Sequence, residues 1–106
     1  MISKELLSAV LGLHCGIKSI KNSEVIYWFD CIGEIREHSI NIYELAHKCK
    51  EWALNLGYIL YSTVHGYECY IDSRNFINNT PVRFLAESEP EAVFKACQWI
   101  LDKDSK

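Results

Sequence analysis

The sequence predicts a small α+β domain in which helices pack on a mainly antiparallel sheet, as in an α-β-α sandwich. Three observations lead to this class. Apolar residues recur at helical spacing in three stretches, β-branched and aromatic residues form several short strand-like runs, and these runs come in two groups separated by a helix. Neighbouring runs joined by short turns favour antiparallel pairing. The expected order is helix, two or three strands, helix, three strands and helix, in one domain over residues 1–106.

Length and composition fit one domain with one modest core. The chain has 106 residues, of which 49% are hydrophobic and 24% charged, and its formal net charge is -3. This composition is too apolar for a disordered chain, and no apolar run approaches the ~20 residues that cross a bilayer. The pI near 5.8 argues against a general nucleic-acid coat, because phosphate binding needs clustered positive charge.

The five cysteines favour a reducing compartment. Their number is odd, and none of them forms the close pairs of a disulfide framework or a zinc site. Apolar residues 6–13 make too short a run for a secretory signal, and no small-residue cleavage site follows them. We therefore expect reduced thiols in a cytoplasmic protein without a signal peptide or a membrane segment.

The N-terminal third is expected to contain one helix and two or three strands. The helix covers residues 3–11, with Ser3 as N-cap and Gly12 after its end. Strands follow over residues 17–20, 24–32 and 35–40, with a turn at residues 21–23. Residues 24–32 are apolar on both faces, which is typical of a central strand that is covered on both sides.

The second helix has clear boundaries, from Asn41 to Leu56. Glu44 stands at capping-box spacing from Asn41, and Gly57 follows the last turn. Its apolar stripe comprises Ile42, Leu45, Ala46, Cys49, Trp52, Ala53 and Leu56. This periodicity predicts that Trp52 is buried.

The last helix is expected over residues 88–101. Ser88 and Glu91 form a capping box, with Pro90 in the first turn. The apolar stripe comprises Val93, Ala96, Cys97, Ile100 and Leu101. Cys97 should therefore be buried, and residues 102–106 should form a solvated tail.

Between these helices, residues 58–64 and 67–73 are predicted to form a hairpin around His65-Gly66. A two-residue loop fixes the pairing, because side chains alternate between the two faces. One face carries the pairs Val64–Tyr67, Ser62–Cys69 and Leu60–Ile71, and the other carries Thr63–Glu68, Tyr61–Tyr70 and Ile59–Asp72. The first set is the better core face. A loop over residues 74–81 leads to a last strand over residues 82–86.

The sequence holds no convincing catalytic set. His47 and Cys49 lie two apart on a helix, about 200° around it, and therefore cannot converge on one metal ion. Cys15, next to His14, is the one cysteine expected to be exposed, and an ordinary loop thiol is its favoured interpretation. No phosphate loop, serine elbow or glycine-rich nucleotide fingerprint occurs. We therefore expect no metal, no cofactor and no enzymatic activity.

Two features of the sequence bear on nucleic-acid binding, the element order of residues 41–100 and the Tyr61–Tyr70 pair. Residues 41–100 share the element order of double-stranded RNA-binding domains, but Glu89 and Glu91 stand at the start of the last helix, where those domains place lysines. Double-stranded RNA is therefore excluded. Stacking of single strands on Tyr61 and Tyr70 is an alternative, although acidic residues flank the pair.

The C-terminal part of the chain carries a distinctive pattern. A helix with a late Trp precedes a Gly and a hairpin, and a strand then leads through an acidic, proline-containing segment into the closing helix. The residues that carry the pattern are Trp52, Gly57, Glu87, Ser88, Pro90, Ala92, Lys95, Ala96 and Trp99. In these features residues 40–101 resemble small proteins of bacteriophages and prophages, including the phage ABA-sandwich type. The resemblance implies a fold and a host-directed binding role by analogy, and it carries over no catalytic residue.

These observations predict a non-enzymatic, phage-type accessory protein that binds another protein, either a host protein or its own copy as a homodimer. The expected contact surface is the second face of the hairpin, because tyrosine and arginine are enriched at interface hot spots. Its residues are Tyr61, Tyr70, Thr63, Glu68, Asp72 and Arg83. The alternatives are a nucleic-acid-associated module that uses the Tyr61–Tyr70 face and, third, a small thiol or metal enzyme that uses Cys15 and His14.

Overall fold

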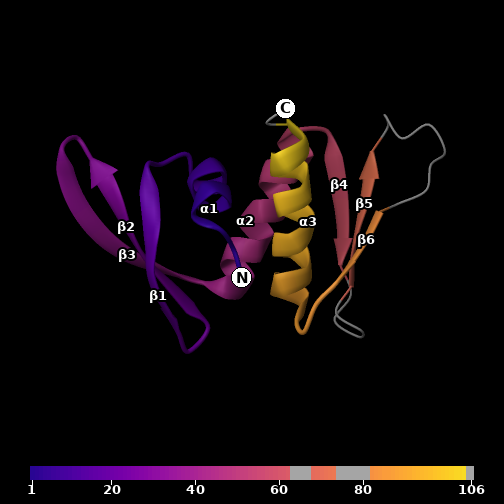
Figure 1. Ribbon diagram of the computed structural model, residues 1–106, viewed down its shortest axis with the longest axis horizontal. Helices are drawn as coiled ribbons and strands as arrows, with labels where there is room; N and C mark the ends of the chain where they lie inside the picture. Colours follow the sequence, from indigo (N-terminus) through magenta and orange to yellow (C-terminus); the bar gives the residue numbers. More distant parts are fainter. Residues whose placement is uncertain (63–67, 74–81, 105–106) are drawn as a thin grey trace.

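Three helices and six strands follow one another in the expected order in the residues that the structure describes, 1–62, 68–73 and 82–104 (Figure 1). The structure is a computed structural model. The elements are α1 (Lys4–Leu11), β1 (Cys15–Lys21), β2 (Glu24–Cys31), β3 (Glu34–Asn41), α2 (Ile42–Asn55), β4 (Tyr58–Ser62), β5 (Glu68–Ser73), β6 (Val82–Leu85) and α3 (Glu89–Asp104). The α+β class and the antiparallel pairing are confirmed.

The strands form two separate sheets with the helices between them. The N-terminal sheet has the order β1-β2-β3 and the C-terminal sheet the order β4-β5-β6, and every strand pair is antiparallel. Figure 1 shows α2 and α3 between the two sheets, with α1 beside β1. The layers thus differ from an α-β-α sandwich, since the helices lie in the middle and the sheets outside. The molecule measures 47 × 30 × 18 Å.

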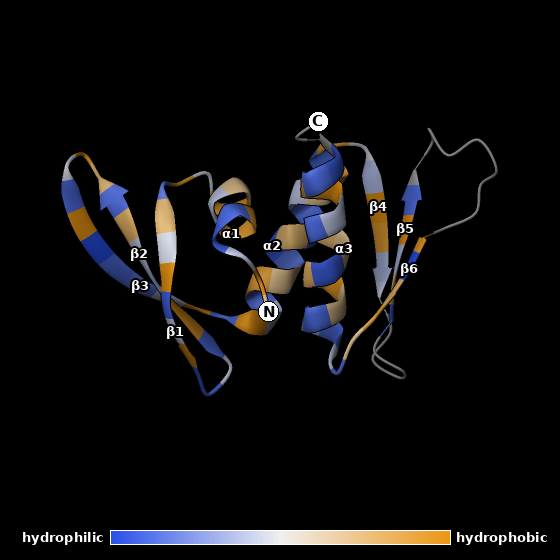
Figure 2. Cartoon of the chain, in the orientation of Figure 1, coloured by the Kyte–Doolittle hydropathy of each residue, from blue (hydrophilic) through white to orange (hydrophobic). Residues whose placement is uncertain are grey.

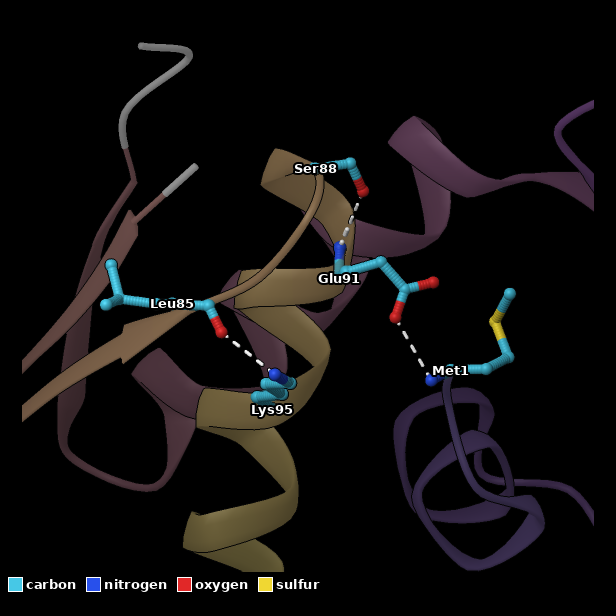
Figure 3. A network of polar contacts seen from close by, with 5 residues as sticks. All are labelled: Met1, Leu85, Ser88, Glu91 and Lys95. Carbon is cyan, nitrogen blue, oxygen red and sulfur yellow. Dashed lines mark hydrogen bonds and ion pairs between the residues drawn. The ribbon is translucent and has the colours of Figure 1, made fainter. Parts of the chain in front are cut away.

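The first helix is capped as its sequence predicts and is tied to α3. The Ser3 hydroxyl accepts a hydrogen bond from the amide of Leu6, and Gly12 closes the helix in the left-handed region at φ 67°. The N-terminal amine lies 3.0 Å from the Glu91 carboxylate (Figure 3). The ion pair with Glu91 holds the start of the chain against the first turn of α3.

In the N-terminal sheet, β2 is central, as expected, but its second face is not covered. Val25 is buried on the inner face, whereas Ile26 and Trp28 on the outer face are half-buried. Trp28 lies across Gly16 of β1, where a Cβ would come 2.5 Å from the indole nitrogen. The prediction of cover on both sides is therefore wrong. One layer of helices serves two sheets, so no described helix is left for the outer face.

Helix α2 supplies much of the core and ends one residue earlier than predicted. The Asn41 side chain accepts a hydrogen bond from the amide of Tyr43 at 2.9 Å, which caps the helix. Leu45, Ala46, Cys49 and Ala53 are buried and Trp52 is half-buried. The periodicity predicts Leu56 on the apolar stripe, but Leu56 is exposed. It is the C-cap of the helix, and the chain turns there towards Gly57 at φ 93°.

The C-terminal sheet has the predicted register. Tyr61 pairs with Tyr70 and Leu60 with Ile71, and β6 adds to β5 with Arg83 opposite Tyr70. The predicted pairs Val64–Tyr67 and Thr63–Glu68, the loop over residues 74–81 and residues 105–106 lie outside the described residues. The inner face of the sheet packs on α2 and α3, which confirms the predicted packing of both helices on this hairpin.

Helix α3 extends to Asp104, three residues beyond the predicted end. The Ser88 hydroxyl accepts a hydrogen bond from the amide of Glu91 at 3.3 Å, as a cap should. The Lys95 ammonium donates to the carbonyl of Leu85 at 2.9 Å and so joins the helix to β6 (Figure 3). Cys97 is fully buried, as predicted.

Each turn of the N-terminal sheet holds two residues at positive φ, and one of these four residues, Ile32, is of a type that disfavours positive φ. Asn22 and Ser23 have φ of 53° and 64°, and Ile32 and Gly33 have 52° and 83°. The carboxylate of Asp30 accepts a hydrogen bond from the amide of Gly33 at 3.0 Å. Ile32 is β-branched and its side chain is 100% exposed, so its backbone is strained without any gain from burial.

Replacing this residue should stabilise the fold. Ile32→Asn is expected to raise the free energy of unfolding by about 1 kcal/mol, because asparagine tolerates the left-handed region. Chemical denaturation of both proteins measures the difference. Ile35→Asn, at an exposed position of β3 without positive φ, is the control and should give no increase. An unchanged or lower stability of Ile32→Asn would contradict this account of the turn.

Candidate protein-interaction surface

The two faces of the C-terminal sheet have different environments. Side chains alternate along each strand, and the inner set lies against α2 and α3. The outer set comprises Ile59, Tyr61, Glu68, Tyr70, Asp72, Arg83 and Leu85. Among the described residues no helix or strand covers this set, and the Tyr61 side chain is 54% exposed. The face on which the sequence places its contact residues is therefore open to solvent.

Three strands bring together one row of residues on this face. Tyr61 of β4 lies opposite Tyr70 of β5, and Tyr70 lies opposite Arg83 of β6. The Tyr70 hydroxyl donates a hydrogen bond to the carboxylate of Glu68. A nitrogen of Arg83 lies 3.7 Å from the other oxygen of the same carboxylate. The carboxylate of Glu68 thereby holds both the phenol and the guanidinium in place on the sheet.

The pKa of Tyr70 reports this arrangement. The hydrogen bond to Glu68 raises the pKa of the phenol above its ordinary value, because the carboxylate favours the neutral hydroxyl. Arg83 acts in the opposite direction, since its positive charge favours the phenolate. The net effect is upward, so Tyr70 stays a hydrogen-bond donor over the whole physiological range.

Apolar side chains extend the row at both sheet edges. Ile59 on β4 and Leu85 on β6 are exposed on the outer face, and Asp72 lies opposite Ile59. Of the predicted contact residues, the structure thus brings Tyr61, Tyr70, Glu68, Asp72 and Arg83 onto one face, whereas Thr63 lies outside the described residues. Ile59 and Leu85 were missed as contact residues, although period-two alternation places both on this face. An apolar and aromatic patch with one ordered charged network is typical of protein interfaces.

The thiol alternative loses its structural basis. Cys15, which was predicted to be exposed, is fully buried, with its sulfur 3.4 Å from the Ser8 hydroxyl. It opens β1 and points towards the core, whereas the ring of His14 lies at 5.5 Å from that of Trp28 on the outer face. His14 directly precedes β1, and its ring lies beside Trp28, whereas the Cys15 thiol is buried in the core, so His14 is not placed to act as a base for Cys15.

The other core cysteines are equally inert. Burial raises the pKa of Cys69 to about 11. A hydrogen bond with Cys49, together with burial, raises the pKa of Cys97, and its thiol lies 3.6 Å from the Cys49 carbonyl. These thiols are protonated hydrophobic groups of the core. Within residues 1–62, 68–73 and 82–104, no group of three or more His, Cys, Asp or Glu side chains is placed to hold a metal ion.

The charges on the outer face do not favour phosphate. Arg83 is engaged with Glu68, and Asp72 adds a second carboxylate to the same face. At the start of α3, Glu89 and Glu91 form an acidic first turn. A nucleic-acid backbone would meet net negative charge at both places, which opposes binding.

Comparison of the chain with protein-family models, with curated proteins and with solved structures gives no match. The resemblance to phage proteins therefore stays a prediction from the sequence. No helix in the described part of the chain is long and apolar enough to cross a membrane.

Thiol accessibility provides a direct test of the cysteine positions. Cys31 is the half-buried cysteine, and the other four are buried. We expect one thiol to react rapidly with Ellman's reagent in the folded protein and four more to react only after denaturation. Cys31→Ser should remove the rapid reaction, whereas Cys15→Ser should leave it intact. A rapid reaction that persists in Cys31→Ser would contradict the burial of the four remaining cysteines, and its loss in Cys15→Ser would assign the exposed thiol to Cys15.

The Tyr70–Glu68 bond can be tested by titration. Tyr70 is expected to have a pKa above the ordinary value of about 10, and Glu68→Gln should lower that pKa because the charged acceptor is removed. The folded-state pKa is raised, so the contribution of this bond to stability is complete below pH ~10 and is lost as the pH rises further. NMR titration of the tyrosine ring carbons measures the pKa, and Tyr70→Phe assigns the signal. Equal Tyr70 pKa values in both proteins would contradict the hydrogen bond.

Proposed function

We propose that the chain is a non-enzymatic, phage-type accessory protein that acts by binding another protein through the outer face of its C-terminal sheet. The observation that carries this proposal is the uncovered row of Tyr61, Tyr70 and Arg83, flanked by exposed Ile59 and Leu85. A monomer gains nothing from exposing apolar and aromatic groups together. A contiguous patch of this kind is typical of a binding surface.

The physical properties of the row suit recognition of a protein. Tyrosine offers a large apolar ring with a polar tip and loses little side-chain entropy when it is immobilised. Glu68 already restrains Tyr70 and Arg83 in the free protein, so less ordering remains to be done on binding. The row lies on paired strands backed by two helices, which makes it a preorganised surface.

The rival functions have less support in the described residues. An enzyme would need a nucleophile or a metal site outside the core, and Cys15 is buried. A nucleic-acid module would need free positive charge beside the tyrosines, and Arg83 is paired with Glu68. The resemblance to phage proteins adds the host as a source of partners by analogy.

Removal of both rings tests the proposal. The double variant Tyr61→Ala/Tyr70→Ala should lose the binding of partner proteins captured by the tagged wild type from a bacterial lysate, with losses of at least ~2 kcal/mol, as is usual at hot spots. Quantitative mass spectrometry of the captured proteins measures the loss. Circular dichroism and thermal melting check that the fold is retained.

A matched control is available on helix α2. Tyr43 on α2 is 59% exposed, close to the 54% of Tyr61, so Tyr43→Ala makes the same chemical change away from the sheet and should leave capture unchanged. Equal capture by wild type and the double variant, with the fold intact, would refute the proposed surface. Binding of labelled single-stranded DNA or RNA that depends on both tyrosines would instead favour the nucleic-acid alternative.

A further inference from the structure

The four edge strands of the two sheets are unequally protected. An exposed strand edge offers unpaired backbone groups to another chain, and proteins commonly block it with charged side chains. The edge strand β1 carries Lys18 and Lys21, β3 carries Glu34, Arg36 and Glu37, and β6 is four residues long and carries Arg83. The edge strand β4 carries no charge, proline or glycine.

The residues of β4 favour strand pairing. They are Tyr58, Ile59, Leu60, Tyr61 and Ser62, which are mostly aromatic or aliphatic and have high strand propensity. Figure 2 shows the hydrophobic colour in the middle of β4, whereas most of β3 is coloured as hydrophilic. In the described part of the chain, β5 is the one strand that lies beside β4.

A shallow apolar groove of about 220 Å³ runs along this edge, between β4 and α2. Leu54 of α2 and Ile59 and Leu60 of β4 contribute apolar groups to it, and both Leu54 and Ile59 are exposed. The charged groups on its rim are engaged within the chain. Lys50 donates to the Ser62 hydroxyl, and Glu51 pairs with His47 at 2.9 Å. The groove therefore suits an apolar occupant.

We propose that β4 pairs with β4 of a second copy of this chain, in antiparallel orientation, so that two C-terminal sheets join into one six-stranded sheet. A two-fold axis makes two identical edges antiparallel, and each edge then satisfies the backbone groups of the other. With Leu60 at the axis, Ile59 of each copy lies opposite Tyr61 of the other. Such aliphatic–aromatic pairs across strands are stabilising.

Among the described edge strands, β4 is the one where charge opposes pairing with a second copy least. Two chains of formal net charge -3 repel each other, and β4 is the one described edge strand where pairing brings no charged strand residue to the seam. Like charges placed opposite one another would oppose self-pairing of β1, β3 or β6. The rim groups Lys50 and Glu51 already make polar contacts inside the chain, with the Ser62 hydroxyl and with His47, so dimerisation does not have to supply a new polar partner for either group.

The available area indicates a reversible dimer. Strand β4 is about 17 Å long and α2 about 21 Å. The strand and helix layers have centres about 10 Å apart and are together about 20 Å wide, so the strip measures roughly 400 Å² in projection. A standard interface buries about 800 Å² of accessible surface per partner. Accessible surface exceeds projected area on a corrugated strip, which places this contact at the low end of specific interfaces. Backbone pairing adds hydrogen bonds to the apolar contact, and we expect micromolar affinity.

This inference concerns the edge of the C-terminal sheet, and it shares Ile59 and Tyr61 with the proposed contact surface on the outer face. Leu54 lies on α2 and not on that face, so a variant at Leu54 tests the edge separately. A dimer joined at β4 keeps Tyr70, Glu68 and Arg83 accessible, since they lie on β5 and β6. The two outer faces of the dimer would then form one continuous surface with two identical binding rows. Failure of one proposal leaves the other standing.

Sedimentation of the full chain across concentrations tests the dimer. Between ~5 and ~500 μM, the average mass of the wild type should rise from 12.3 kDa towards twice that value. Ile59→Lys and, separately, Leu54→Lys should hold the mass at the monomer value, because each places a charge beside the seam. Leu54 lies on α2, so its variant leaves the outer face unchanged.

Two further measurements make the result specific to the edge. Leu85→Lys makes a similar change on β6, where Leu85 is 49% exposed against 41% for Ile59, and should dimerise like the wild type. Hydrogen exchange should show concentration-dependent protection at every second amide of β4. A wild type that stays monomeric throughout, or a dimer lost equally in Leu85→Lys and Ile59→Lys, would overturn the proposal. A dimer without protection in β4 would overturn it as well.

Discussion

The single layer of helices between two sheets is the constraint on which the rest of this structure depends. Two sheets have four faces, and the three helices lie between them, so two faces stay outside. The core forms where α2 and α3 meet, around buried Cys49, Cys97 and Ile100. Cysteine and alanine occur often in this layer, and small side chains let the two helices approach each other closely. The described residues hold no further helix with which to cover the outer faces.

Each outer face meets this exposure in a different way. On the N-terminal sheet, Trp28 lies flat across Gly16, and Lys18 pairs with Glu37 at 2.8 Å. On the C-terminal sheet, Tyr61 is exposed and Tyr70 is half-buried, beside the contacts of Glu68 with Tyr70 and Arg83. On the N-terminal sheet the Trp28 ring lies on the backbone of its strand neighbour Gly16. On the C-terminal sheet the exposed Tyr61 ring is available to a partner. This contrast is why the C-terminal face is the better binding surface.

The turns of the N-terminal sheet are short, and the edge strands of the two sheets differ in charge. Both hairpins of the N-terminal sheet turn over two residues at positive φ, which keeps the strands tightly connected. Charged side chains on β1 and β3 then oppose pairing with other chains. Strand β4 lacks such protection and borders an apolar groove. An unprotected edge next to an exposed tyrosine row concentrates the interaction surfaces of the molecule at one end.

Local chemistry allowed the sequence by itself to determine the helices, most of the strands and the register of the β4–β5 hairpin. The caps at Ser3, Asn41 and Ser88 act within a few residues, and strand alternation fixes which side chains share a face, so Tyr61 and Tyr70 could be paired without coordinates. The burial of Cys15 and the separation into two sheets could not be obtained in this way. They depend on which face of each sheet the helices cover, and contacts between residues far apart in sequence decide that. The tertiary structure alone therefore decided that no described element covers the tyrosine face and that β5 is the one described strand beside β4.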